Sequence, residues 1–242
     1  FGYELLNVDE SQMMANAVRF QNNGYNIFEF DGTSSGFLNS LILNWPNILG
    51  YDVTFLSTRI TAIFIISLIF YTCYMFFRFE LNRKLSFLLI LPGLVFFSFT
   101  HDPDFLHYSS ELLSTLFLLI CLYGFKKNLK IKNPNVFYFG MILIGLIIFS
   151  KTQITPTASF LAFSICCYSI IKKKYKILRN CIFLFFSPII LIISIYILKG
   201  YFNDYFINYF EFSKAVASKY SLGENILSQD NLETKIVNKK GI

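Results

Sequence analysis

Charged residues are scarce in this chain: Asp, Glu, Lys and Arg make up 15% of its 242 residues, against about 25% in soluble globular domains. A chain of this length could bury one large core in water, but it has too few charged side chains to cover that core. Disorder is excluded as well, because 55% of the residues are hydrophobic and 19% are aromatic. With a mean hydropathy of +0.53, the composition indicates that lipid is the solvent for much of the chain.

Histidine is nearly absent, with two residues, and the five cysteines lack the spacing of a metal site. All five lie inside apolar runs, and their number is odd, so neither a disulfide framework nor a zinc site is expected. They are interpreted as small apolar side chains. The net charge of +6 is divided among the links between apolar runs, which argues against a nucleic-acid partner.

Six apolar runs are interpreted as membrane spans. A span needs ~20 residues at 1.5 Å rise per residue, and several runs are shorter, so five or seven spans remain possible. The sequence predicts an all-α, polytopic transmembrane bundle over residues 52–199. The runs are Val53–Phe77, Leu85–Phe99, Leu112–Phe125, Val136–Ser150, Pro156–Ile171 and Cys181–Leu198.

The links between these runs alternate in charge. Residues 78–84, 126–132 and 172–179 hold 12 of the 21 Lys and Arg residues and one of the 15 acids, Glu80. Short basic loops stay in the cytoplasm, so the remaining links and both ends of the chain are expected outside. No initiator Met or signal peptide precedes the first outer segment. We therefore expect that a preceding span is missing and that the chain is a fragment.

Both outer ends show amphipathic patterns. Two apolar stripes at helical spacing predict two helices lying along the membrane surface within residues 1–51. An aromatic stripe predicts a partly amphipathic segment over residues 200–242, as an interfacial helix or a sugar platform. The stripes are Met13, Met14, Ala17 and Val18; Phe37, Leu38, Leu41, Ile42, Trp45, Ile48 and Leu49; and Tyr201, Phe202, Tyr205, Phe206, Tyr209 and Phe210.

Acidic residues gather on the expected outer side, and the densest polar patch is residues 101–111, which contain both histidines. An ionisable residue at or below the membrane surface is costly and is a functional candidate. Simpler interpretations remain open. The acids can stabilise a helix N-terminus or a solvated turn, the histidines can lie at the interface, and cations at span ends can reach the headgroups. The residues concerned are Asp9, Glu10, Asp31, Asp102, Asp104, Glu111, His101, His107, Arg59 and Lys151.

Four stretches in order resemble the motifs of GT-C glycosyltransferases, most closely a bacterial group similar to protein O-mannosyltransferases that includes lipid A aminoarabinose transferase. Phe37 stands where relatives usually have Pro, and the preceding span, the later spans and the soluble domain of full-length relatives are absent. The resemblance covers about residues 1–200. The stretches are Asp9–Gln12, Asp31–Ser40, Asp104–Glu111 and Ser150–Pro156.

The resemblance implies transfer of a sugar from a polyprenyl-phosphate carrier to a lipid, glycan or protein acceptor at the outer face of a bacterial inner membrane. It implies Asp9 as the base, supported by Glu10. It also implies three groups of binding residues: Lys151, Arg59 and Gln153 at the donor phosphate; Asp31, Asp104, His107, Tyr108 and Glu111 in the substrate pocket; and Asp102 with Asp104 at a divalent cation, the one cofactor considered.

Three other functions remain open. A flippase or transporter subunit for lipid-linked sugars would carry polar groups near the midplane and often an inverted repeat, whereas these apolar runs are nearly free of charge and show no repeat. A polysaccharide polymerase or ligase more often depends on outer Arg and His residues. The third alternative is an inactive truncated transferase.

Overall fold

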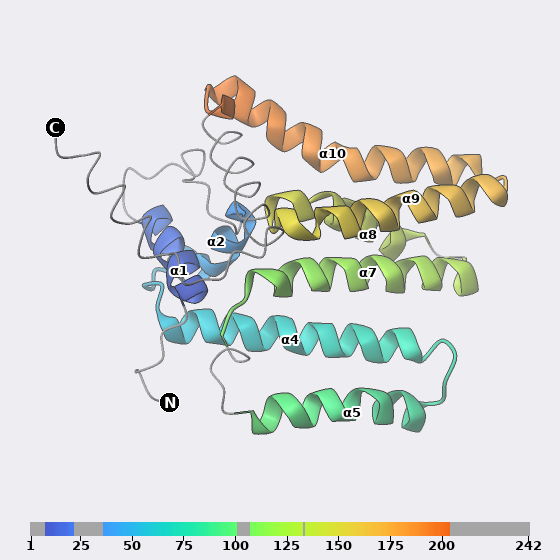
Figure 1. Ribbon diagram of the computed structural model, residues 1–242, viewed down its shortest axis with the longest axis horizontal. Coiled ribbons are helices and arrows are strands. Elements are labelled where there is room, and N and C mark those ends of the chain that lie inside the picture. Colours follow the sequence, from blue (N-terminus) through green and yellow to red (C-terminus); the bar gives the residue numbers. More distant parts are fainter. Residues whose placement is uncertain (1–7, 22–35, 101–106, 133, 204–242) are drawn as a thin grey trace, which may run out of the picture.

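The protein is a helical bundle with short helices gathered at one end (Figure 1). The computed structural model describes residues 8–21, 36–100, 107–132 and 134–203. Within these ranges the chain is almost entirely helical and contains no strand. The predicted all-α fold is therefore confirmed.

Each of the six apolar runs forms a helix, and local signals in the sequence set several of the boundaries. Thr54 and Ser57 form a reciprocal capping box before the first long helix. The Asn82 side chain caps the next one, accepting from the Leu85 N–H. The last long helix ends at Gly200, whose φ of 79° favours glycine. The helices are α4 (Phe55–Phe77), α5 (Arg83–Phe99), α7 (Ser110–Ile131), α8 (Asn135–Gly145), α9 (Thr155–Ile171) and α10 (Tyr175–Lys199).

Four helices are long and apolar enough to cross a membrane: α4, α7, α9 with the short 3-10 helix η2 (Thr152–Ile154) before it, and α10. The 17 residues of α5 span about 25 Å and the 11 residues of α8 still less, against a hydrocarbon core of ~30 Å. A second 3-10 helix, η1 (Ile147–Phe149), extends α8 only slightly. The count of six spans therefore stays a prediction.

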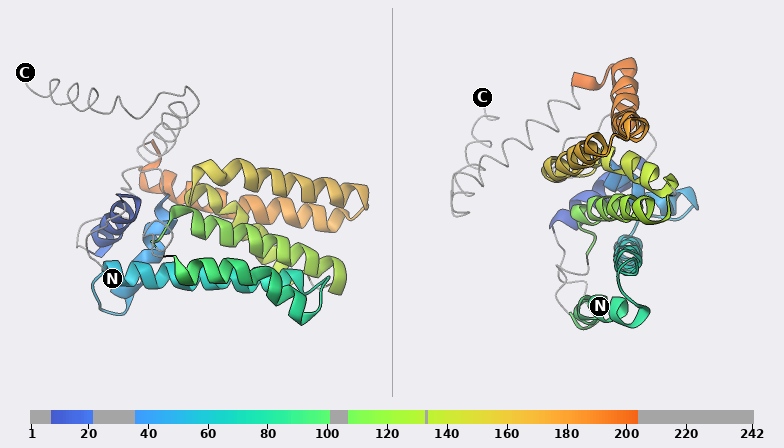
Figure 2. Two further views of the ribbon diagram at one scale, coloured as in Figure 1. Left: turned by 60° about the horizontal axis from the view of Figure 1, so that its bottom comes forward. Right: turned by 90° about the vertical axis from the view of Figure 1, so that its right-hand side faces the viewer.

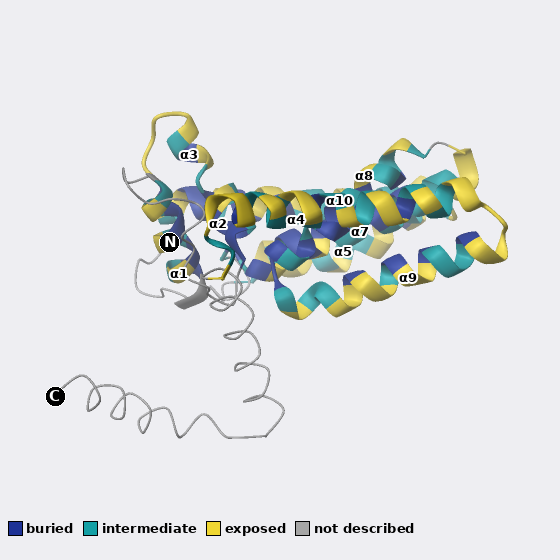
Figure 3. Ribbon diagram, turned by 90° about the horizontal axis from the view of Figure 1, so that it is seen from above, coloured by how far each residue is buried: buried dark blue, intermediate teal, exposed yellow. Residues whose placement is uncertain are grey.

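The long helices leave much apolar surface uncovered. In α10, only 17% of the most apolar segment is buried inside the protein. Exposed residues also recur along α9 (Figure 3). A soluble protein rarely exposes contiguous apolar surface on this scale, so these faces fit a lipid environment.

The helices pack side by side in space in the order α5, α4, α7, α8, α10 and α9 (Figure 2). The most extensive contact joins α7 and α8, which approach each other through glycine. A Cβ on Gly124 would lie 2.7 Å from the Phe137 backbone, and one on Gly140 would lie 2.6 Å from Cys121 Cα. The fully buried side chains of Phe137 and Met141 surround this contact, so α7 and α8 form the centre of the bundle.

Replacing Gly140 by Ala is expected to lower the free energy of unfolding by about 1–3 kcal/mol, because the new methyl group meets backbone that cannot move aside. Thermal unfolding in detergent measures the loss. Gly93→Ala is the matched control, since its Cβ meets only the movable ring edge of Phe70. Equal losses in the two variants would contradict this explanation of the α7–α8 contact.

The two ends of the bundle differ in charge and structure. Because helices that follow one another along the chain run antiparallel, α4, α7 and α9 begin at the end where α5, α8 and α10 finish (Figure 1). The helices α1 (Val8–Gln21), α2 (Phe37–Leu43) and α3 (Trp45–Ile48) lie at this end, which we call the α1 end. The three basic links lie at the opposite end, the basic end, as their alternation along the sequence predicts.

The first predicted stripe lies on one helix and the second is divided between two, and that these helices lie along the membrane surface stays a prediction. Met13 and Ala17 on α1 are buried in the main core. The second stripe is divided between α2 and α3 at Asn44, just before Pro46, which lacks an N–H to continue the helix. As a result Leu43 is buried, whereas four residues of the predicted stripe are exposed: Leu41, Trp45, Ile48 and Leu49.

Of the aromatic stripe in residues 200–242, the structure describes Tyr201 and Phe202, which pack against a small cluster around Tyr196. The rest of that predicted segment lies outside the described residues.

Candidate functional site

Buried polar side chains concentrate at the α1 end, although they come from widely separated parts of the sequence. Buried polar groups normally need hydrogen-bond partners, and those found here join α1, α2, α4, α7 and the segment between α8 and α9. The buried set includes Glu10, Asn39, Thr58, Tyr108, Ser110, Ser114, Ser150 and Lys151.

Lys151 is a buried cation held by two groups at the start of α7. It is 5% exposed, and its Nζ lies 2.9 Å from Glu111 Oε1 and donates to Ser110 Oγ at 2.7 Å. Its backbone is extended between η1 and η2 (φ −150°, ψ 109°). A buried ammonium group is stable only with such partners, so Ser110 and Glu111 allow Lys151 to stay buried as a cation.

Glu111, the carboxylate partner of Lys151, is only partly buried. It lies in the first turn of α7, where the helix dipole favours a negative charge. The Ser109 hydroxyl accepts from the Glu111 N–H and donates to the Glu111 carboxylate. The Glu111 side chain is 50% exposed, so its carboxylate connects the buried Lys151 to the surface of the α1 end.

A hydrogen-bond network around Ser150 fixes the position of Lys151. The Ser150 carbonyl accepts from the Gly36 N–H at 2.7 Å and from Asn39 Nδ2 at 2.8 Å. Asn39 Oδ1 accepts from the Tyr108 hydroxyl at 2.9 Å, and Ser114 donates to the Ser150 hydroxyl at 3.1 Å. These bonds tie α2, the segment before α7 and the α8–α9 segment into one unit.

Replacing Tyr108 by Phe is expected to lower the free energy of unfolding by about 1 kcal/mol, because Asn39 loses a buried donor but keeps Ser150. Thermal unfolding in detergent measures this loss. Tyr71→Phe is the control, since Tyr71 is 60% exposed on α4. An unchanged stability in Tyr108→Phe would show that this hydrogen bond does not hold the segment.

Glu10 joins the first outer segment to α4. It is fully buried on α1, and its Oε1 lies 3.2 Å from the hydroxyl of Thr58, which also donates to the Phe55 carbonyl. Its Oε2 lies 3.8 Å from Nη2 of Arg59. The structure thus brings together a candidate catalytic residue and a candidate phosphate ligand. Asp9 belongs to α1, but its side chain lies outside the described part of the chain.

Other candidate residues are less directly placed. His107 is half-buried beside Tyr108, whose hydroxyl is engaged by Asn39, and Gln153 is exposed on η2. The remaining candidates, Asp31, Asp102 and Asp104, lie outside the described residues. Within the described ranges, no three His, Cys, Asp or Glu side chains are grouped to hold a metal ion, and the predicted Asp102–Asp104 cation site stays a prediction.

Several residues that build the site are not predicted from the sequence. The hydroxyls of Thr58, Ser110 and Ser114 do not differ in the sequence from the many other polar residues of apolar helices. Their signal was their place in the first or second turn of a helix, beside a charged candidate such as Arg59 or Glu111.

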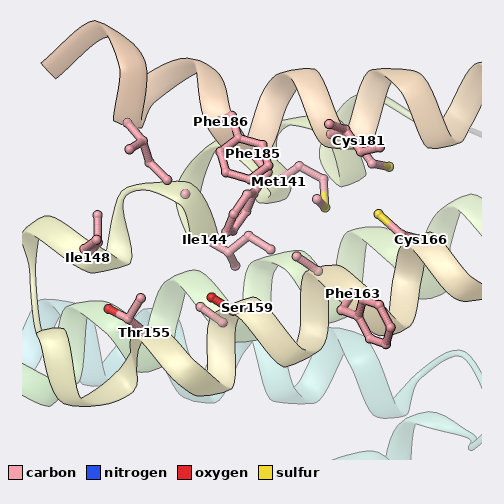
Figure 4. Close-up of a pocket in the computed structure, with 15 residues that line it drawn as sticks. Met141, Ile144, Ile148, Thr155, Ser159, Phe163, Cys166, Cys181, Phe185 and Phe186 are labelled. Atoms are coloured by element: carbon pink, nitrogen blue, oxygen red, sulfur yellow. The ribbon is translucent and has the colours of Figure 1, made fainter. Parts of the chain in front are cut away.

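An apolar cavity of about 680 Å³ lies among α8, α9 and α10 (Figure 4). Met141 and Ile144 line it from α8, and Phe185 and Phe186 line it from α10. On α9, the hydroxyl of Thr155 is buried with no hydrogen-bond partner in the described part of the chain. The volume of the cavity is within the ~300–1,000 Å³ typical of ligand sites. Because the lining is apolar except near Thr155, the cavity suits a largely hydrocarbon ligand with a polar group at one end.

The polar end of the cavity is close to Lys151 along the chain. Thr155 follows Lys151 by the single turn of η2, which rises ~2 Å per residue. Lys151 is therefore close along the chain to the Thr155 end of the cavity, which extends from there along the bundle as far as Cys166 and Cys181.

Together these features define a protein that is almost entirely helical over its described residues, with four helices able to span a membrane and, at one end, a buried lysine paired with a half-exposed glutamate. Comparisons with protein-family models, curated proteins and solved structures find no match for the chain. Its function must therefore be argued from the site itself.

Proposed function

We propose that this protein is a membrane glycosyltransferase that moves a sugar from a polyprenyl-phosphate carrier to a lipid, glycan or protein acceptor. The observation that supports this most is the buried cation of Lys151 one short turn away from the apolar cavity. A lipid phosphate offers an anionic head and a hydrocarbon tail in the same arrangement. The described residues of the motifs that resemble GT-C glycosyltransferases fall at this end of the bundle.

In this proposal Lys151 binds the donor phosphate. When the bond between the anomeric carbon and the phosphate oxygen breaks, the phosphate gains negative charge. A fixed cation in a water-poor setting stabilises that charge most at the transition state. Ser110 and Glu111 hold the ammonium group in place until the donor arrives.

Asp9 is proposed as the base. In a single inverting displacement, the acceptor hydroxyl attacks the anomeric carbon and its proton passes to a carboxylate within hydrogen-bond reach. Glu10, fixed against Thr58 and Arg59, holds the start of α1 against α4. Glu10 thereby sets the place of its neighbour in the chain.

We further propose that the α1 end faces the outside of a bacterial inner membrane. The support is the distribution of charge: the three links at the opposite end contain 12 Lys and Arg residues and one acid. Short basic links remain in the cytoplasm. The donor would then be used on the outer face.

The distribution of polar groups favours surface chemistry over transport. In the described spans, charged side chains lie near helix ends, and the cavity is lined almost wholly by apolar groups. A transporter usually binds its substrate near the midplane with polar groups. A lipid-linked sugar flippase is therefore the weaker candidate.

Sugar transfer by the full chain in liposomes tests the proposal. With a radiolabelled polyprenyl-phosphate sugar and membrane acceptors, we expect labelled acceptor and free polyprenyl phosphate in equal amounts. Protein-free liposomes are the control. Movement of intact donor across the bilayer without cleavage would replace this proposal with a flippase.

A further inference from the structure

The link between α9 and α10 carries an unbalanced cluster of cations. All five basic residues are exposed: Lys172, Lys173, Lys174, Lys176 and Arg179. The one acid at the basic end in the described residues is Glu80, and it pairs with Lys126 and Lys130 of α7 at 3.3 Å each. Hydrogen bonds from these two lysines lower the pKa of Glu80. The Glu80 carboxylate is thus paired with lysines of α7 and not with the cations of the α9–α10 link.

The α9–α10 turn holds its lysines in a fixed and strained arrangement. The Lys174 N–H donates to the Ser169 carbonyl and the Lys173 N–H to the Ile170 carbonyl, closing α9 with a Schellman motif. Lys173 occupies the left-handed position of this motif, with φ 54°, where glycine is favoured. A charged residue therefore stands at the tip of the turn despite its conformational cost.

Apolar side chains flank the same cations. Ile170, Ile171 and Tyr175 are 51%, 75% and 64% exposed. Farther along α10, Phe183 is 70% exposed. A ligand that covers both the lysines and these side chains must carry negative charge and hydrocarbon together. An acidic protein would supply the first, but only an amphiphile supplies a tail that continues along α10.

We propose that the α9–α10 link is a binding site for anionic phospholipid, with the headgroup on Lys172, Lys173 and Lys176 and the acyl chains along Ile171 and Phe183. The charge complementarity is that of basic clusters at the cytoplasmic ends of membrane helices. This site is separate from the α1 end, so it does not depend on the proposed transferase activity.

Quenching of a tryptophan by brominated lipids tests this proposal. Trp45 is the chain's one tryptophan and lies at the α1 end, so the variant Trp45→Phe with Tyr175→Trp places a single probe in the link. The variant is reconstituted with the two brominated lipids at equal mole fractions, and quenching of the probe reports which lipid occupies the link. The link is expected to bind brominated phosphatidylglycerol at least about fivefold more tightly than brominated phosphatidylcholine. Equal quenching by the two lipids would overturn the proposal.

Charge removal then separates a site from a diffuse surface potential. Lys172→Gln with Lys173→Gln should lower the preference for the anionic lipid about 25-fold, or abolish it, since each cation contributes about fivefold. Arg83→Gln with Lys84→Gln removes the same charge from an exposed stretch of the same end and should leave the preference nearly unchanged. An equal loss in both variants would show a diffuse effect and no site.

A third variant guards against a folding artefact. Lys173→Gly removes one cation but relieves the positive φ, so thermal stability should hold or rise while lipid preference falls severalfold. A preference unchanged in Lys173→Gly would remove the tip lysine from the site.

Discussion

Replacing Asp9 by Asn is expected to reduce sugar transfer by 10²–10⁴-fold, the range typical for loss of a general base. The amide has nearly the same shape but cannot take the acceptor's proton. Membrane insertion and thermal stability should stay unchanged, because α1 is held through Glu10, Met13 and Ala17. Initial rates with a polyprenyl-phosphate sugar measure the effect.

Asp52→Asn is the matched control for this substitution. Asp52 is exposed in the segment just before α4 at the same end of the bundle, so its variant should transfer sugar at the wild-type rate. If Asp9→Asn also retained wild-type turnover, Asp9 would not be the base, and another acid of the α1 end would have to take the proton of the acceptor.

Replacing Lys151 by Met is expected to reduce transfer about 10²–10³-fold, the loss typical of removing one group that stabilises transition-state charge. Both the donor KM and kcat should change, since the cation meets the phosphate before and during reaction. The fold should tolerate Met, because the buried space is filled by an apolar chain and Glu111 is half-exposed to water.

Two further variants separate charge from packing at this position. Lys151→Arg keeps the positive charge and should recover part of the activity. Lys199→Met removes a cation from the exposed last turn of α10 at the same end and should leave kcat and KM unchanged. Wild-type kinetics in Lys151→Met would exclude it as the phosphate ligand.

The sequence predicts the helices well because the signals are local. Long apolar runs bounded by polar residues define all six helices. Every second link between these helices is basic, and the basic links lie at one end of the bundle. The buried stripe of α1 follows from helical spacing alone. These features need no knowledge of which helices are neighbours.

The parts that depend on tertiary contacts could not be predicted. Gly145 packs so closely on α10 that its Cβ would lie 2.2 Å from the Phe185 carbonyl oxygen, and α8 ends there, short of the predicted run. The bond between Asn39 and Ser150 joins residues 111 positions apart. Lys151 and Glu111 were each singled out, but their pairing depends on how α7 meets the end of α8.

The sequence likewise does not predict the apolar cavity. Some of its lining residues, such as Phe163 and Phe186, are also exposed on the outer surface, and composition does not distinguish a residue that faces a cavity from one that faces outward. Only the packing of three helices defines it.

Photolabelling with a polyprenyl phosphate that carries a diazirine near its head tests most directly whether the cavity and Lys151 form a lipid-phosphate site. In membranes containing the full chain, the label is expected on α9 and α10 near Ser159, Phe185 and Phe186. Unlabelled polyprenyl phosphate should compete, and Lys151→Met should greatly weaken the labelling. Labelling spread equally over the exposed faces of α4 and α5, insensitive to competitor and to Lys151→Met, would contradict a lipid-phosphate site at the α1 end.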